Sequence, residues 1–256
     1  MLATQAERRG VEVLRKRRVA GIERCGDRWK LGLTDGSEFA ARFLVDATGR
    51  RAAVARRHGA RLHAVDRLVA FARFFKMSSD HEPGVLIESF ADGWWYTAGL
   101  PDGLQVVACM TDIDVARELR LADRERWLCA LASTRWIQRV ADGELQGRPI
   151  VASAGTVYAD PVCDRDWIAV GDAASAFDPL SAQGIAKALR SGIFASYAIA
   201  DRLSKDDHAG LRRYRSFVRS ELENYRKTHA QYSAEERRWP DRPFWRRRQA
   251  ACAAPI

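Results

Sequence analysis

The segment 167-WIAVGDAASAFDPLSAQGIAKALRSG-192 decides the expected fold, because an apolar run ends on Gly-Asp and a strong helical pattern follows it. The run predicts a buried strand with Gly171 and Asp172 at its carboxyl end. Glycine there lets a ligand approach the backbone, and a carboxylate can accept hydrogen bonds from ligand hydroxyls. Pro179 lies in the following turn, and the helix that opens at Gly184 presents free N–H groups to an anion. The segment predicts a ligand-binding strand, turn and helix, although an ordinary connection with a capping aspartate fits it equally well.

The rest of the chain has the pattern of a mixed α/β protein. Residues 2–9 predict a helix, 11–14 a short strand, and 17–49 three β-type runs, the last ending on a buried strand. From about residue 57 the alternation of apolar and polar residues predicts a second, antiparallel sheet, and residues 114–141 show helical spacing. Residues 184–203 and most of 208–239 are also expected to be helical, because apolar residues recur in them at the same helical spacing.

Composition places the chain among soluble globular proteins. Hydrophobic residues make up 47% of its 256 residues and charged residues 29%. The sequence has no apolar run of about eighteen residues, and its first residues lack the layout of a signal peptide, so we expect a cytoplasmic protein without a membrane partner. The five cysteines are widely spaced without a C-x-x-C motif, which predicts neither disulfides nor a metal site.

The net charge of +9 raises the question of a nucleic-acid partner. The arginines, however, are scattered among acidic residues along helix-like segments, except in the cluster 237-RRWPDRPFWRRR-248. This distribution favours solvated helix faces and a basic tail over nucleic-acid binding, and it also suits an anionic substrate or a phosphate-bearing cofactor.

Two motifs together resemble those of a known superfamily. The sequence VDATGR at 45–50, followed much later by GDAASAFDPLSAQGI at 171–185, is similar to the paired flavin motifs of FAD-dependent aromatic hydroxylases and flavin halogenases. The resemblance implies a fold like that of p-hydroxybenzoate hydroxylase, an α/β FAD-binding domain with an inserted β-sheet domain. On this basis the FAD-binding domain comprises residues 1–56 and 151–200, the substrate-binding sheet 57–150 and a C-terminal helical segment 201–256.

The resemblance also implies which residues contact FAD. Asp172 is expected at the ribityl chain, and Gln183, Gly184 and Ile185 at the pyrimidine edge of the flavin ring, where the helix dipole favours the reduced, anionic cofactor. The expected FAD-binding residues are Asp46, Gly49, Arg50, Gly171, Asp172, Pro179, Gln183, Gly184 and Ile185.

The chain departs from the superfamily pattern at its start. Members normally begin with a G-x-G-x-x-G strand-turn-helix that takes the cofactor's pyrophosphate, and this sequence contains no such motif. We therefore expect an incomplete FAD-binding domain, weak or no FAD binding by the chain alone, and self-association through an exposed sheet edge.

The predicted activity is monooxygenation of an aromatic, indole or tryptophyl substrate, either a small molecule or a peptide side chain. The stretch 93-GWWYTAGLP-101 departs from the W-x-W-x-I-P motif of flavin halogenases, and the best likeness is to halogenase-like proteins that hydroxylate a peptidyl tryptophan. The flavin carries the oxygen-transfer chemistry, with NAD(P)H or a separate flavin reductase as electron source, so no catalytic side chain is predicted. The alternatives are a flavin-dependent halogenase, or a non-catalytic fragment or split half that needs an N-terminal partner to bind FAD.

A few further side chains carry predictions of their own. Trp94 and Tyr96 alternate with Trp95 on one strand, so Trp94 and Tyr96 are candidates to contact the substrate while Trp95 faces the other way. Lys187 and Arg190 lie one turn apart on the helix after Gly184 and could face an acidic group, but two cations on a helix are usually solvated, and this is the expectation for both. None of the five histidines has a triad-like or metal-like companion nearby in the sequence, so no catalytic histidine is expected.

Overall fold

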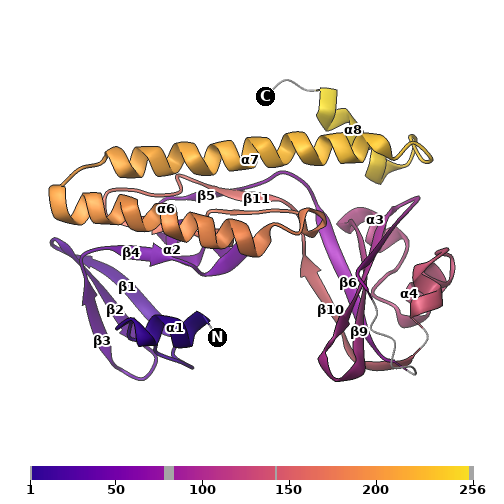
Figure 1. Ribbon diagram of the computed structural model, residues 1–256, viewed down its shortest axis with the longest axis horizontal. Coiled ribbons are helices and arrows are strands. Elements are labelled where there is room, and N and C mark those ends of the chain that lie inside the picture. Colours follow the sequence, from indigo (N-terminus) through magenta and orange to yellow (C-terminus); the bar gives the residue numbers. More distant parts are fainter. Residues whose placement is uncertain (1, 78–83, 142, 254–256) are drawn as a thin grey trace.

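Two long helices connect the two ends of the molecule (Figure 1). The computed structural model describes residues 2–77, 84–141 and 143–253. Helices α6 (Gly184–Lys205) and α7 (Ala209–Glu235) run antiparallel along the long axis, with a small sheet below one end and a larger sheet below the other. Helix α8 (Pro243–Ala253) lies against the far end of α7. Among the described residues, no helix combines the length and the apolar character that a membrane crossing requires.

The end of the molecule with the small sheet contains the first expected flavin motif, residues 45–50. Helix α1 (Leu2–Arg8) precedes an antiparallel sheet of order β1-β2-β3, whose strands are β1 (Val19–Cys25), β2 (Arg28–Leu33) and β3 (Glu38–Ala41). Strand β4 (Leu44–Asp46) pairs in parallel with β12 (Trp167–Ala169), which brings the two motifs side by side. The strand expected at residues 11–14 was wrong, because that stretch is assigned to no strand and pairs with none.

The larger sheet agrees with the predicted alternation. Its order is β10-β6-β9-β8-β7 and all its pairings are antiparallel; the strands are β6 (Leu68–Lys76), β7 (Leu86–Phe90), β8 (Gly93–Leu100), β9 (Leu104–Asp112) and β10 (Glu144–Ser153). Trp95 packs in one core with Trp127 of helix α4 (Arg124–Ala132), whereas Trp94 packs on the opposite face against Phe244 of α8. The two neighbouring tryptophans therefore face opposite sides of the sheet, as predicted.

Short elements complete the fold and join the two ends. A third sheet, of order β13-β11-β5, runs between the two ends; its strands are β5 (Arg61–Ala64), β11 (Val157–Asp160) and β13 (Ser175–Ala176). The remaining α-helices are α2 (Ala53–Arg57), α3 (Ile113–Glu118) and α5 (Ile137–Val140). The 3₁₀ helices are η1 (Gly49–Arg51), η2 (Pro101–Gly103), η3 (Gly171–Ala173) and η4 (Pro179–Ser181).

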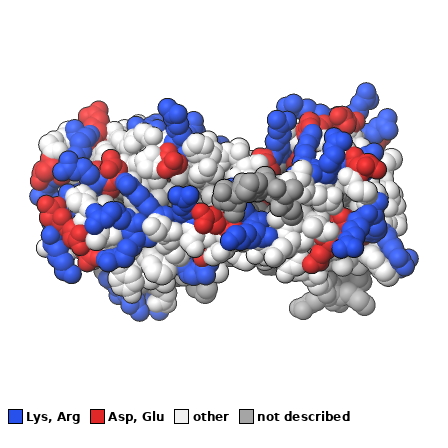
Figure 2. Space-filling view, turned by 90° about the horizontal axis from the view of Figure 1, so that it is seen from above, with Lys and Arg blue, Asp and Glu red and all other residues white. Residues whose placement is uncertain are grey.

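The arginine-rich C-terminal cluster, which was expected as a basic tail, is docked onto the larger sheet. Arg242 donates to both carboxylate oxygens of Asp92, and the buried Arg248 lies 2.9 Å from Asp112. The same Arg248 guanidinium stacks 3.5 Å from the ring centre of Phe244, which is fully buried. Figure 2, which looks onto α7 and α8, shows acidic side chains interspersed among the basic ones. Much of the positive charge of this segment is therefore used to hold α8 in place.

Two carboxylates of this docked segment have lowered pKa values. Hydrogen bonds from Arg238, with a further one from Ser89, lower the pKa of Glu236 from 4.5 to about 2. Hydrogen bonds from Arg247 lower the pKa of Asp114 from 3.8 to about 2. Because both pKa values are depressed in the folded state, these groups add stability above their ordinary pKa values and lose it as the pH falls toward 2.

We expect the resistance of the protein to urea to fall between about pH 4.5 and about pH 2, as these two carboxylates take up protons. The substitution Arg238→Gln should flatten this decline, because Glu236 then titrates at a more ordinary pH. Arg246→Gln is the matched control, since Arg246 is exposed and forms no ion pair with any described residue. Urea denaturation at a series of pH values measures the effect, and equal pH profiles for the two variants would contradict the assignment.

Helix α6 exposes an apolar stripe, which we define as Ile185, Leu189, Ile193 and Tyr197. These residues recur every four positions, and their exposed fractions range from 50% to 79%. Val45 on strand β4 is also exposed, and within the described residues β4 pairs only with β12. A helix normally buries such a face against another element, so the stripe and the strand edge form a surface suited to a further partner.

We expect the chain to self-associate through the apolar stripe when it is purified alone. The double substitution Leu189→Glu and Ile193→Glu should reduce the apparent mass in light scattering, because two carboxylates cannot be buried without partners. Gln231→Glu, at an exposed position on α7, adds the same kind of charge elsewhere and should leave the apparent mass unchanged. A wild-type protein that is monomeric at every concentration would overturn this prediction.

Candidate functional site

The segment that runs from the end of β12 into the first turn of α6, residues 170–185, forms the centre of the candidate site, and we refer to it as the motif loop. At its start, Gly171 has a backbone φ of +57°, a conformation that favours glycine. Its N–H donates to Ser191 Oγ at 2.7 Å, and a Cβ at this position would lie 3.2 Å from the Ala188 side chain. Gly171 therefore lets the loop leave the strand in close contact with α6.

A buried lysine holds the aspartate that follows. Lys187 Nζ lies 3.2 Å from Asp172 Oδ1, and the same ammonium donates to the backbone carbonyl of Ser175. The expectation that Lys187 is solvated was wrong, because only 3% of this side chain is exposed, against 42% of Asp172. Burial lowers the pKa of Lys187, and the Asp172 carboxylate acts in the opposite direction. The pair leaves Asp172 oriented by the protein and still accessible to a ligand.

Arg50, the last residue of the first motif, points into the protein. Its guanidinium donates to the backbone carbonyls of Gly155, of Ala154 at 3.2 Å and of Phe177 at 2.8 Å. These contacts tie η1 to the motif loop and to the segment that leaves the larger sheet. Arg50 thus shapes the site by holding the backbone.

Asp46 is also occupied by internal hydrogen bonds. It is fully buried, and its Oδ1 accepts from the N–H and the hydroxyl of Thr48. Its Oδ2 accepts from the N–H groups of Val54 and Ala55, at the start of α2. Gly49 follows with φ +71° and open space around its Cβ position. The first motif is therefore a folded turn whose carboxylate caps α2, and Asp46 has no spare acceptor for a ligand.

The start of α6 has free capacity to bind a ligand. Gln183 occupies the cap position but its side chain does not cap the helix, and Gln183, Gly184 and Ile185 are all exposed. A Cβ on Gly184 would meet no atom within 4 Å. Pro179 opens η4 and thereby sets the turn that leads to this end. An exposed, uncapped helix end beside a half-exposed carboxylate fits the edge and the ribityl hydroxyls of a flavin.

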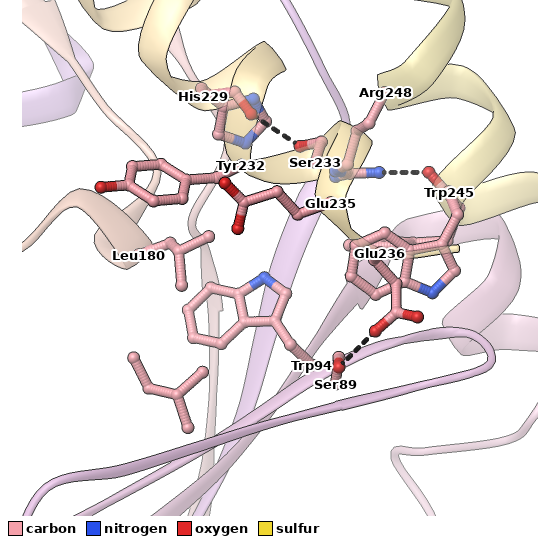
Figure 3. Close-up of a pocket in the computed structure, with 12 residues that line it drawn as sticks. Ser89, Trp94, Leu180, His229, Tyr232, Ser233, Glu235, Glu236, Trp245 and Arg248 are labelled. Atoms are coloured by element: carbon pink, nitrogen blue, oxygen red, sulfur yellow. Dashed lines mark hydrogen bonds between the residues drawn. The ribbon is translucent and has the colours of Figure 1, made fainter. Parts of the chain in front are cut away.

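A cavity of about 280 Å³ lies beside the motif loop, between the larger sheet and the ends of α7 and α8 (Figure 3). It is lined by Ile87, Ser89, Trp94, Leu180, His229, Tyr232, Ser233, Glu235, Glu236, Phe244, Trp245 and Arg248. Leu180 belongs to the motif loop, so one wall of the cavity is continuous with the candidate cofactor site. Of the two aromatic residues predicted to contact substrate, Trp94 lines this cavity and Tyr96 does not.

A hydrogen-bonded aspartate and histidine connect the cavity to the motif loop. His229 Nε2 lies 3.3 Å from Oδ2 of Asp178, whose side chain is almost entirely buried. The spacing of histidines and acidic residues in the sequence did not indicate this pair. The two residues are 51 positions apart, so only the packing of α7 over the motif loop brings them together.

We expect Lys187→Met to lower the free energy of unfolding by about 1–2 kcal/mol, because the buried Ser175 carbonyl loses its donor. Arg190→Met, one turn along α6, removes only a half-exposed ion pair with Glu221 and should change stability by less than about 0.5 kcal/mol. Urea denaturation of both variants tests the difference, and equal stabilities would show that Lys187 contributes no more than a surface residue.

Comparisons with known proteins agree on one family. A family model described as tryptophan halogenase matches residues 1–255. LodB of Marinomonas mediterranea, described as an FAD-dependent oxidoreductase, is 34% identical over 214 residues, which cover 82% of this chain and 57% of LodB.

Solved structures with a similar fold include two flavoenzymes of different activity. CmlS, a flavin-dependent halogenase, has a TM-score of 0.83 at 23% identity, over 96% of this chain and 48% of its own. QhpG, a peptidyl tryptophan dihydroxylase essential for tryptophylquinone cofactor biogenesis, has a TM-score of 0.67 at 28% identity, over 97% of this chain and 57% of its own. The chain spans about half the length of these relatives.

Proposed function

Since this chain belongs to the tryptophan halogenase family, we propose that it provides flavin-facing and substrate-facing surfaces of an FAD-dependent monooxygenase. The observation that carries the proposal is the half-exposed Asp172 carboxylate beside the uncapped start of α6. In this assignment residues 1–56 and 151–200 serve the cofactor, 57–150 the substrate, and 201–256 cover the site.

The residues of this chain have distinct tasks around the cofactor. FAD, when bound, supplies the oxygen-transfer chemistry. Asp172 accepts hydrogen bonds from the ribityl hydroxyls, and Lys187 holds that carboxylate in place. The N–H groups at Gln183, Gly184 and Ile185 stabilise negative charge at the flavin edge. Electrons come from NAD(P)H or from a separate flavin reductase.

The proposed substrate is an aromatic ring, carried by a small molecule or by a peptidyl tryptophan. Trp94, Phe244 and Trp245 give the cavity apolar aromatic walls, and Leu180 places it next to the motif loop. Hydroxylation is favoured over halogenation because QhpG, which acts on peptidyl tryptophan, shares 28% identity over 97% of this chain. Halogenation remains the second candidate, supported by the family model itself.

In the polypeptide extended by its upstream coding sequence, we expect Asp172→Asn to weaken FAD binding about tenfold or more, because the acceptor of the ribityl hydrogen bonds loses its charge. The matched control is Asp164→Asn, an exposed aspartate in the turn before β12 that should leave FAD binding unchanged. Flavin absorbance retained after desalting measures the binding. If both variants bind FAD like the wild type, Asp172 is not a cofactor residue.

The exposed apolar stripe on α6 suggests that FAD binding involves elements beyond the residues of this chain. We propose that a further strand and helix, on the same or another polypeptide, cover this stripe and the β4 edge when the cofactor is held. FAD retention should therefore be compared between this chain alone and the polypeptide extended by its upstream coding sequence. Retention by neither form would refute the flavin assignment.

Product analysis separates the two candidate reactions. With reduced flavin and oxygen, a hydroxylase converts an indole substrate equally well with or without bromide or chloride. A halogenase requires the halide and incorporates it into the product. A strict halide requirement would replace the favoured activity by the second candidate.

A further inference from the structure

The Asp178 carboxylate is fixed from several sides. Its Oδ1 accepts from the N–H of Leu180 at 2.8 Å, and its own N–H donates to the hydroxyl of Tyr225 at 3.2 Å. The Tyr225 hydroxyl in turn lies 2.9 Å from Thr156 Oγ1, and both oxygens are buried. Oδ2 of Asp178 is therefore aimed at one partner, His229 Nε2.

This contact selects one form of the neutral imidazole. A buried carboxylate accepts hydrogen bonds, so the ring nitrogen that faces it carries the hydrogen. In neutral His229 the hydrogen is thus on Nε2, and Nδ1 keeps its lone pair. Within the described part of the chain, Nδ1 forms no hydrogen bond, while the side chain lines the cavity. The residue that carries this unused acceptor therefore lines the cavity.

The charged side chains that line the rest of the cavity determine which ligand charge it favours. Glu235 and Glu236 both line the cavity, and the exposed Glu235 carboxylate forms no ion pair or hydrogen bond with any described residue. Arg248 also lines it, but its guanidinium is occupied by Asp112 and by the Phe244 carbonyl. Unpaired negative charge disfavours an anion, and the aromatic walls favour a flat apolar ring.

We infer that His229, oriented by Asp178, is a specificity-determining residue of this cavity, and that the cavity takes a neutral aromatic ring bearing an N–H or O–H group that donates to Nδ1. The inference rests on the proposed function for the assignment of the cavity as the substrate site. An indole or a phenol has the required donor, whereas a ring whose donor is methylated does not. Asp178 is then a positioning residue, since it acts through His229.

The test compares indole with N-methylindole, which has the same ring without the N–H donor. On the wild-type protein containing isotope-labelled histidine, we expect indole to shift the His229 Nδ1 resonance in nuclear magnetic resonance spectra, and N-methylindole to leave it unchanged. Calorimetry should show that indole binds about tenfold more tightly, as one added hydrogen bond predicts. His229→Phe should abolish this preference, and Asp178→Asn should reduce it.

His208→Phe is the matched control, because His208 lies at the opposite end of α7 and should keep the full preference for indole. Equal affinity of the wild type for the two probes, or an unmoved His229 resonance with indole bound, would overturn the inference. FAD retention is measured in parallel on this chain and on the polypeptide extended by its upstream coding sequence, and FAD counts as absent only when neither form retains it. Retained FAD with equal probe affinities refutes only the role of His229, whereas absent FAD with a shifted resonance refutes the proposed function and upholds the role of His229.

Discussion

The guanidinium of Arg50 is the contact on which the arrangement of the site depends. Arg50 follows strand β4, and its guanidinium donates to the backbone carbonyls of Ala154, Gly155 and Phe177, which lie more than 100 positions away in the chain. Buried carbonyls need hydrogen-bond donors, and the Arg50 side chain supplies donors to all three. Without it, packing these segments together would bury unpaired carbonyl groups at a cost in free energy. The larger sheet, the first motif and the motif loop are therefore held at one point, and the cavity can lie next to the proposed flavin site.

Much of the fold could be predicted from the sequence, because hydrophobic periodicity is a local property. The alternation through Trp94 and Trp95 correctly predicted opposite faces of the larger sheet, and the pattern after Gly184 correctly predicted a long helix. The stretch 11–14 has the composition of a strand but no neighbour to pair with, and composition alone cannot supply one. The ion pairs of the C-terminal arginines were also missed, because they depend on acidic residues of a distant sheet.

The candidate site was less accessible to prediction than the fold. The motifs correctly indicated that a strand ends just before Gly171 and that a helix begins at Gly184, but they did not indicate the positive φ of Gly171. They did not reveal that Asp46 and Arg50 are directed inward, because a motif specifies residue types and not the direction of a side chain. The pairing of His229 with Asp178 is a tertiary contact between α7 and the motif loop, and no local spacing encodes it.

The proposed flavin-facing residues and most of the cavity-lining residues come from different parts of the chain, and this separation has an evolutionary consequence. The surfaces proposed for the flavin come from residues 171–187, whereas most of the cavity wall comes from the end of α7 and from α8, held on the sheet by Arg242 and Arg248. Mutation or recombination in the last few dozen codons can therefore reshape the cavity while the flavin-facing segment is inherited intact. Selection can then alter most of the cavity wall without changing the flavin-facing residues, although Asp178 and Leu180 of the motif loop link the two surfaces, which is one route by which a single scaffold diversifies.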